Sequence, residues 1–301
     1  MAEKFPGLGK IQKIGVTIGN SCPNRDGTIG RGGCIYCNNA SFSPSYINSS
    51  EYKANTVDKI KHTLEEGRNF FAGKYPRMKY LAYFQSYTNT HGADTETLVS
   101  FYTAAAETKD VVGIIIGTRP DCIPRDLLDA LTRFNNEVCP VMIEFGAESS
   151  HDATLQTINR CHTWDTTVDA VTRCAEKGLS VGLHFIMGLP GETQQMMLET
   201  VRRAVKLPID TLKFHQLQII KDTPLARIYS QNPDYVELFT PSAYAALCTK
   251  IIEIVGPTGI AIERFVSQAP ENLLVAPRWG LKNYQFTHLL NNLLSDNNYH
   301  Q

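Results

Sequence analysis

Short apolar runs alternate along this 301-residue chain with longer amphipathic stretches. The apolar runs predict strands at Lys13–Gly19, Lys79–Gln85, Val111–Gly117, Pro140–Gly146, Leu179–Met187 and Thr211–Leu217. The amphipathic stretches predict helices at Val57–Gly73, Asp94–Thr108, Arg125–Phe134, Trp164–Lys177, Thr193–Lys206 and Ser242–Val255. Strands that alternate with helices of this length indicate βαβ units and a parallel sheet.

Six such units favour an α/β fold built as a partial (β/α)6 barrel, because a closed barrel needs eight. After residue 240 the pattern adds a helix, a strand-like segment at Ile260–Arg264 and a last helix near Leu281–Leu294. We therefore expect a core over residues 1–235 and a small C-terminal α/β cap over residues 236–301, packed on the core.

In parallel α/β folds the chemistry lies on the loops that follow the strands. Polar or glycine-rich sequences stand at these places: a cysteine loop after the first strand, Gln85-Ser86 after the second, Thr118-Arg119 after the third, Glu148 after the fourth and Gly188 after the fifth. These loops are the candidate site.

Composition narrows the function classes. The net charge of −1 gives no global positive field for nucleic acid, although a local basic face is compatible with it. Met1–Lys10 lacks the apolar segment of a signal peptide, and no apolar run is long enough to cross a bilayer. We expect a cytoplasmic protein with no membrane partner.

Three of the eight cysteines cluster, with the spacing C-x11-C-x2-C at Cys22, Cys34 and Cys37, in a glycine-rich loop. Thiolates hold 4Fe–4S clusters, normally four at a time. Three of them would leave one iron open for chemistry. The alternatives are a structural zinc site, for which the nearest histidine, His62, is distant in sequence, or plain thiols. The remaining cysteines are scattered, and small buried positions suit most of them: Cys122, Cys139, Cys161, Cys174 and Cys248.

Ser21–Cys37 resembles the loop SCPNRDGTIGRGGCxxC of a bacterial family within the radical S-adenosylmethionine (radical SAM) superfamily. Tyr36 fits the aromatic residue that precedes the last cysteine in that superfamily. Glu144–Ser149 resembles the motif E-x-G-x-Q-S, Arg160–Thr163 resembles R-G-H-T, and His184–Thr193 resembles a motif that ends in GLPGET. The chain looks most like the branch of the elongator catalytic subunit and the oxygen-independent coproporphyrinogen oxidases.

The resemblance implies an enzyme with two cofactors, a 4Fe–4S cluster on the three cysteines and S-adenosylmethionine. Reductive cleavage of S-adenosylmethionine gives a 5′-deoxyadenosyl radical, which abstracts hydrogen from the substrate. A flavodoxin or ferredoxin is the implied electron donor. The protein supplies binding and orientation for chemistry that belongs to its cofactors.

The resemblance also suggests the residues that contact S-adenosylmethionine. Arg160 would bind the carboxylate, Gln85 and Ser86 the amino group, Glu148 and His184 the ribose, and backbone after Gly188 the adenine. Glu144 is a further candidate contact, unless strand alternation points it elsewhere. Glu148 replaces the branch glutamine, His184 replaces an acidic residue, and Gly117 replaces a glutamate. Each of these contacts has an alternative. The two glutamates could instead form local salt bridges, and His184 could instead be a hydrogen-bonded residue of the core.

The sequence leaves two substrate classes open, RNA and a small molecule. The elongator likeness favours RNA, with the wobble uridine of tRNA as the expected target. The segments Ile262–Phe265 and Ala276–Lys282 combine basic residues with Trp279, and Tyr284 follows them. The near-zero net charge and the lack of an elongator-type acetyltransferase domain count against it. The coproporphyrinogen oxidase likeness favours a small molecule in a closed cavity. A non-enzymatic metal-binding module is the third reading.

Overall fold

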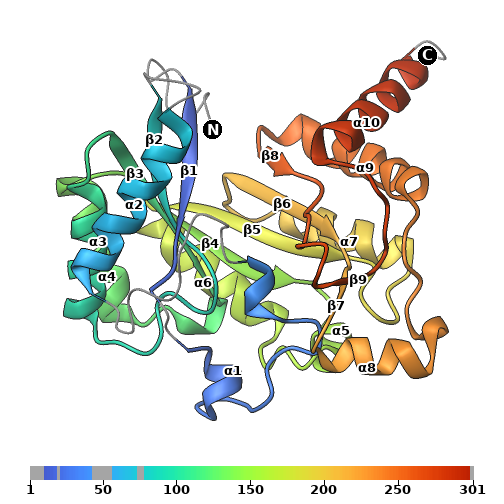
Figure 1. Ribbon diagram of the computed structural model, residues 1–301, viewed down its shortest axis with the longest axis horizontal. Helices are drawn as coiled ribbons and strands as arrows, with labels where there is room; N and C mark the ends of the chain where they lie inside the picture. The colour runs from blue at the N-terminus through green and yellow to red at the C-terminus, as the bar shows by residue number, and fades with distance from the viewer. Residues whose placement is uncertain (1–9, 19–20, 43–55, 73–77, 299–301) are drawn as a thin grey trace. The chain divides into compact units, whose positions relative to one another are not determined.

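The computed structural model describes residues 10–18, 21–42, 56–72 and 78–298. Its main sheet has seven strands in the order β1 (Ile11–Val16), β2 (Lys79–Phe84), β3 (Val111–Thr118), β4 (Val141–Glu148), β5 (Ser180–Met187), β6 (Thr211–Gln216) and β8 (Ala261–Arg264) (Figure 1). The strand pairs β1·β2, β2·β3, β3·β4, β5·β6 and β6·β8 are parallel. This sequential parallel order confirms the predicted partial barrel.

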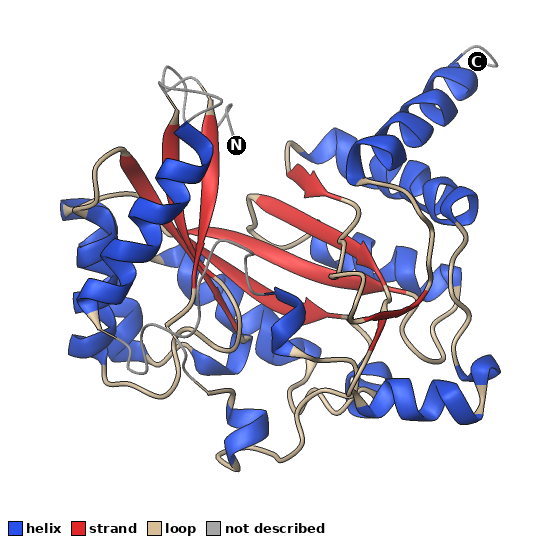
Figure 2. Ribbon diagram, viewed as in Figure 1, coloured by secondary structure: helices blue, strands red, loops and turns tan. Residues whose placement is uncertain are grey.

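Ten α-helices connect or follow these strands in the described residues (Figure 2): α1 (Pro23–Asp26), α2 (Val57–Ala72), α3 (Thr95–Ala106), α4 (Arg125–Glu137), α5 (Asp152–Thr157), α6 (Trp164–Glu176), α7 (Gln194–Ala204), α8 (Pro224–Gln231), α9 (Pro241–Val255) and α10 (Asn283–Asn298). The two short strands β7 (Ile219–Ile220) and β9 (Leu274–Ala276) form an antiparallel pair. All six predicted strands and all predicted helices are present. Gly19 and Gly73, the last residues of two predicted elements, lie outside the described residues.

The strand-like segment Ile260–Arg264 is a strand, but it belongs to the main sheet. As β8 it pairs in parallel with β6, which makes it a seventh barrel strand. The sequence places it in the cap because no apolar run marks it; its side chains are half-buried or exposed.

The chain divides into two compact units. The first comprises Met1–Arg31, Phe42–Gly146 and Ala170–Val181, and the second comprises Gly32–Ser41, Ala147–Asp169 and Gly182–Gln301. The division into residues 1–235 and 236–301 that the sequence suggests remains a proposal.

Each unit has its own apolar packing. In the first, Leu81, Ile115 and Met142 of neighbouring strands form a buried cluster. In the second, Phe214 of β6 stacks between Phe185 and Phe265, with ring centroids 6.1 and 5.9 Å apart. Side-chain caps fix several helix starts: Thr193 accepts a hydrogen bond from the Met196 N–H at the start of α7.

No helix in the described residues has the length and apolar character needed to span a membrane.

Candidate functional site

Cys34 and Cys37 lie in a tight turn that backbone hydrogen bonds hold from several directions. The Cys37 N–H donates to the Cys34 carbonyl at 3.0 Å. Between them, the Ile35 N–H donates to the Ile158 carbonyl after α5, and the Ile35 carbonyl accepts from the Leu225 N–H in α8, at 3.1 and 2.9 Å. The turn therefore has a fixed backbone, as a ligand loop for a rigid cluster requires.

Cys22 starts a small folded excursion. It is the N-cap of α1, after which Gly27 takes a left-handed conformation with φ 95°. The N–H groups of Ile29 and Gly30 return to the Pro23 carbonyl at 2.9 and 3.1 Å. Asp26 pairs with His91 Nε2 at 2.7 Å. The eleven residues between the first two cysteines thus contain a short helix and turns that backbone hydrogen bonds hold in place.

The structure describes Cys22 in the first unit and Cys34 and Cys37 in the second. Among the described residues, no three His, Cys, Asp or Glu side chains form a metal-ligand group. The ligand assignment to the three cysteines therefore remains a proposal. It agrees with the donor chemistry, because thiolate sulfur is the ligand that iron–sulfur clusters take.

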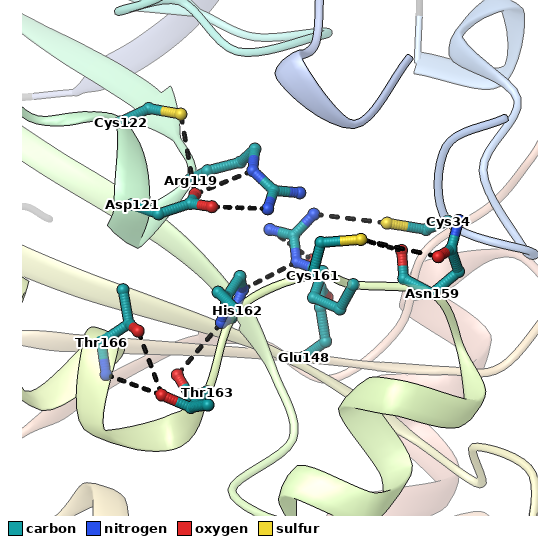
Figure 3. A network of polar contacts seen from close by, with 11 residues as sticks. Cys34, Arg119, Asp121, Cys122, Glu148, Asn159, Cys161, His162, Thr163 and Thr166 are labelled. Atoms are coloured by element: carbon teal, nitrogen blue, oxygen red, sulfur yellow. Dashed lines mark hydrogen bonds and ion pairs between the residues drawn. The ribbon is translucent and has the colours of Figure 1, made fainter. Parts of the chain in front are cut away.

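Arg160 is the centre of a buried polar network in the second unit, and its partners Cys34, Glu148 and His162 are labelled in Figure 3. Its Nη1 donates to the Cys34 Sγ at 3.5 Å, and its Nη2 pairs with Glu148 Oε1 at 3.4 Å. Its Nε donates to His162 Nε2 at 3.0 Å, and the other ring nitrogen of His162 faces the Thr163 carbonyl at 3.1 Å. The acceptor role at Nε2 leaves the proton on Nδ1, so His162 is neutral and fixes the plane of the guanidinium.

Electrostatics keep this arginine charged. Burial alone would lower the pKa of Arg160, but the neighbouring Tyr36, Cys34 and Glu148 outweigh it and raise the pKa well above its usual value. Burial, together with the charges of Cys34 and Glu148, raises the pKa of the Tyr36 hydroxyl. Arg160 thus offers a permanently charged, planar fork for a carboxylate close to one of the proposed iron ligands.

The sequence predicted Tyr36, Glu148 and Arg160 as cofactor contacts, and the structure brings them together around Cys34. His162 was part of a recognised motif but had no predicted role. The sequence shows only that His162 follows Arg160 by two residues. The two side chains come within hydrogen-bond distance because the backbone turns between them.

Left-handed backbone marks the same loops. Glu148, Asn159 and Cys161 have φ values of 67°, 55° and 61°, and Ser86 and Tyr87 in the first unit have φ values of 71° and 57°. Side chains with a Cβ adopt such values at a cost, and they gather at ligand-binding positions. Asn159 also donates from Nδ2 to the Gly33 carbonyl at 2.8 Å, which ties its loop to the cysteine turn.

Gln85 and Ser86 follow β2, as predicted. The Gln85 N–H continues the sheet by donating to the Val16 carbonyl at 3.1 Å. The Ser86 Oγ is buried and makes no hydrogen bond with another described residue. A buried hydroxyl in a left-handed turn fits a position that receives a polar ligand, such as the amino group of S-adenosylmethionine.

Glu144 lies in the first unit and has an ion-pair partner within that unit. Its carboxylate is buried and pairs with Lys13 Nζ at 3.0 Å, and the same ammonium lies 4.9 Å from the centre of the Tyr83 ring. The local salt bridge considered for this residue is therefore present. Its role as a cofactor contact stays a prediction.

The turn between β5 and α7 needs glycine at 188. Gly188 has φ 89°, and a Cβ there would lie 3.1 Å from Cε2 of Phe239. Nearby, Ser149 donates a short hydrogen bond to Glu192, whose pKa is raised by burial. This contact fastens the GLPGET turn to the loop after β4.

Replacing Gly188 with alanine is expected to lower the free energy of unfolding by about 1–3 kcal/mol, because the new Cβ meets both an unfavourable φ and the Phe239 ring. Urea unfolding measures this. Gly256→Ala is the matched control, because no atom lies within 4 Å of its Cβ position and its φ is −51°. Equal stability of the two variants would contradict the steric account.

His184 is half-buried on β5 and lies near a second histidine that the sequence did not single out. His215 of β6 has a pKa lowered from 6.5 to about 3, first by burial and then by the charges of Arg264 and His184. His215 is therefore neutral in the folded protein at neutral pH.

This lowered pKa predicts acid sensitivity. Below about pH 6.5 the unfolded chain binds a proton at this histidine and the folded protein does not, so the free energy of unfolding falls as the pH falls toward 3. Urea unfolding between about pH 7 and pH 5 is expected to show a shallower pH slope in His215→Gln than in the wild type. His288→Gln, at an exposed site on α10, is the control and should keep the wild-type slope. An unchanged slope in His215→Gln would contradict the assignment.

Two family models match this chain. The model of the Radical SAM superfamily matches residues 16–204, and the model of the Radical_SAM C-terminal domain matches residues 209–295. The first match contains the cysteine loop, the Arg160 network and the GLPGET turn. The second contains β6 and β8.

Curated relatives extend over most of the chain. The protein YtqA of Bacillus subtilis (strain 168) is 32% identical over 292 residues, which are 97% of this chain and 87% of the relative. A tRNA-2-methylthio-N(6)-dimethylallyladenosine synthase of Clostridium botulinum (strain Okra / Type B1) is 22% identical over 213 residues, 68% of this chain and 44% of that protein.

Solved structures share the fold. Elp3 of the archaeon Methanocaldococcus infernus, with an N-terminal deletion, matches with a TM-score of 0.67 at 14% identity, covering 96% of this chain and 63% of that one. The coproporphyrinogen III oxidase HemN of Escherichia coli matches with a TM-score of 0.53 at 15% identity, covering 83% of this chain and 53% of that one. These are the two branches that the sequence motifs predicted.

Proposed function

This chain belongs to the radical SAM superfamily, and from that premise we propose that it is the enzyme that modifies the wobble uridine of a tRNA. Membership makes it a radical SAM enzyme with a 4Fe–4S cluster and S-adenosylmethionine as cofactors. Together these supply, when bound, a 5′-deoxyadenosyl radical for hydrogen abstraction. The choice of tRNA as substrate is the step beyond membership.

The chain's own residues would hold the cofactors as follows. Cys22, Cys34 and Cys37 would bind three irons. The Arg160 guanidinium, oriented by His162, would bind the carboxylate of S-adenosylmethionine, and Ser86 with Gln85 would accept from its amino group. Because the Arg160 network is largely dry, these charge-assisted contacts are stronger than they would be in water.

Three exposed basic and aromatic side chains in the second unit are the observation that favours RNA. Tyr284 at the start of α10 is 68% exposed, and Lys282 and Arg278, two and six residues before it in the sequence, are also exposed. Trp279, predicted alongside Tyr284 as a base-stacking residue, instead packs against Phe286 at 5.6 Å and donates from Nε1 to the Phe239 carbonyl at 2.8 Å. Tyr284 thus remains the stacking candidate, with two cations for phosphates.

The relatives give less specific support for an RNA substrate. One curated relative carries a tRNA-modifying activity in its name. The likeness to Elp3 covers nearly the whole chain and concerns the fold alone.

Binding to an anticodon stem–loop RNA with a wobble uridine tests these side chains. Tyr284→Ala is expected to weaken binding on the order of tenfold through loss of stacking, and Lys282→Gln to reduce the slope of log affinity against log salt by about one. Lys206→Gln, at an exposed lysine two residues after the end of α7, is the control and should change neither the affinity nor the salt slope. Wild-type affinity in both test variants would exclude these side chains as RNA contacts.

The function itself is tested by comparing modified nucleosides in total tRNA from cells with and without the gene. We expect loss of a modified wobble uridine, or accumulation of its precursor, in the deletion strain. Restoration requires the wild-type gene, and a Cys34→Ala copy should fail. An unchanged profile would contradict the tRNA proposal and favour the small-molecule class, for which the likeness to HemN supports the fold alone.

A further inference from the structure

Strand β8 contains a β-bulge at Glu263. Ala261 pairs with Thr211 of β6 and Ile262 with Leu212, but the next pair joins Lys213 to Arg264. Glu263 is the extra residue. A bulge interrupts the alternation of side chains between the two faces of a sheet and redirects a side chain, often beside a functional site.

The bulge places two opposite charges beside one face of β6. Glu263 Oε1 lies 3.2 Å from Nζ of Lys213. Arg264 lies close enough to His215 for its charge to lower the pKa of that histidine. Lys213 and His215 are two residues apart on β6 and therefore share a face, opposite to the stacked ring of Phe214.

Lys213 is more deeply buried than its partner Glu263, which suggests different roles for the two side chains. The Lys213 side chain is only 3% exposed, whereas that of Glu263 is 19% exposed. A buried ion pair contributes little net stability, because desolvation of both charges offsets their attraction. The buried ammonium does, however, hold the more accessible carboxylate in one orientation. The Arg264 side chain is exposed.

The result is a fixed acceptor beside a cationic donor. We propose that Glu263 and Arg264 bind the hydrogen-bonding edge of the target uracil, an assignment that rests on the tRNA function proposed above. The uracil N3–H donates to the Glu263 carboxylate, and the Arg264 guanidinium donates to the adjacent carbonyl oxygen. The carbonyl in question is that of C2: the N3–C2 edge lies across the ring from the C5–C6 bond, so binding it leaves C5 accessible for chemistry.

The test uses fluorescence anisotropy with two anticodon stem–loop RNAs that differ only at the wobble base, uridine in one and 3-methyluridine in the other. The methyl group removes the only N–H donor of the base. The reconstituted wild-type protein is expected to bind the uridine RNA at least about tenfold more tightly, since a hydrogen bond to a charged group is lost.

Two variants separate the roles. Lys213→Met/Glu263→Leu removes acceptor and partner together, so that no unpaired charge is left buried, and it should abolish the preference between the two RNAs. Arg264→Gln should weaken binding of both RNAs and keep the preference, because both bases retain their carbonyl oxygens. Glu253→Gln, an exposed site on α9, is the control and should match the wild type. Circular dichroism confirms that each variant is folded.

The outcomes distinguish this proposal from the function on which it rests. If the wild type binds both RNAs equally, or the double variant keeps the preference, then Glu263 does not bind the base, while an RNA substrate remains supported. If neither RNA binds at low salt, the tRNA function itself fails, and this assignment fails with it.

Discussion

Replacing Cys34 with alanine is expected to abolish the iron–sulfur cluster. Anaerobically reconstituted wild-type protein should contain about four irons per chain, and the variant should contain almost none, because a cubane cluster held by two thiolates is not retained. Iron and sulfide assays, with electron paramagnetic resonance of the reduced protein, measure this. Cys34 is the sharpest choice among the three cysteines because it is buried and contacts Arg160.

Cys139→Ala is the matched control, because Cys139 lies in the connection between α4 and β4, outside the cysteine loop. It should retain the wild-type iron content. A Cys34→Ala protein that still binds four irons per chain, or a wild type that takes up zinc in their place, would overturn the ligand assignment.

Arg160→Lys is expected to raise the dissociation constant for S-adenosylmethionine by on the order of tenfold to a hundredfold. Lysine keeps the charge but loses the planar fork, and it has no second N–H arm for Glu148 or His162. Equilibrium dialysis with the reconstituted protein measures the constant, and the iron content shows whether the cluster is intact.

Arg202→Lys, on the exposed face of α7, is the control for the arginine-to-lysine substitution and should bind S-adenosylmethionine as the wild type does. His162→Gln should lie between the wild type and Arg160→Lys, since glutamine can still accept from Arg160 Nε. Wild-type affinity in Arg160→Lys with an intact cluster would exclude Arg160 as the carboxylate ligand.

The sequence predicts the architecture well because the core strands are long, apolar and regularly spaced by helices. The errors have local causes. The first strand was expected at Lys13–Gly19 but is Ile11–Val16, because its limits are set by pairing with β2, from Ile11 opposite Lys79 onward. Helices α5 and α8 are short, and neither shows enough turns for a helical period to emerge.

The sequence predicts those residues of the candidate site that belong to recognisable motifs. It does not predict contacts that depend on backbone turns or on the register between strands. Glu148 and Arg160 are twelve residues apart in sequence, and only the left-handed turns at Glu148, Asn159 and Cys161 bring their side chains together. The Lys213–Glu263 pair spans two strands, and the bulge that permits it is invisible in a pattern of apolar and polar positions. The Asp26–His91 pair likewise joins the last residue of α1 to the loop between β2 and α3, and the two sequences carry no shared signal.

Formation of 5′-deoxyadenosine tests the central claim most directly. Reconstituted protein, incubated anaerobically with S-adenosylmethionine and dithionite, should produce 5′-deoxyadenosine and methionine in equal amounts, detected by liquid chromatography and mass spectrometry. The Cys34→Ala protein should produce neither. A fully reconstituted and reduced wild-type protein that binds S-adenosylmethionine yet yields no 5′-deoxyadenosine would contradict the account.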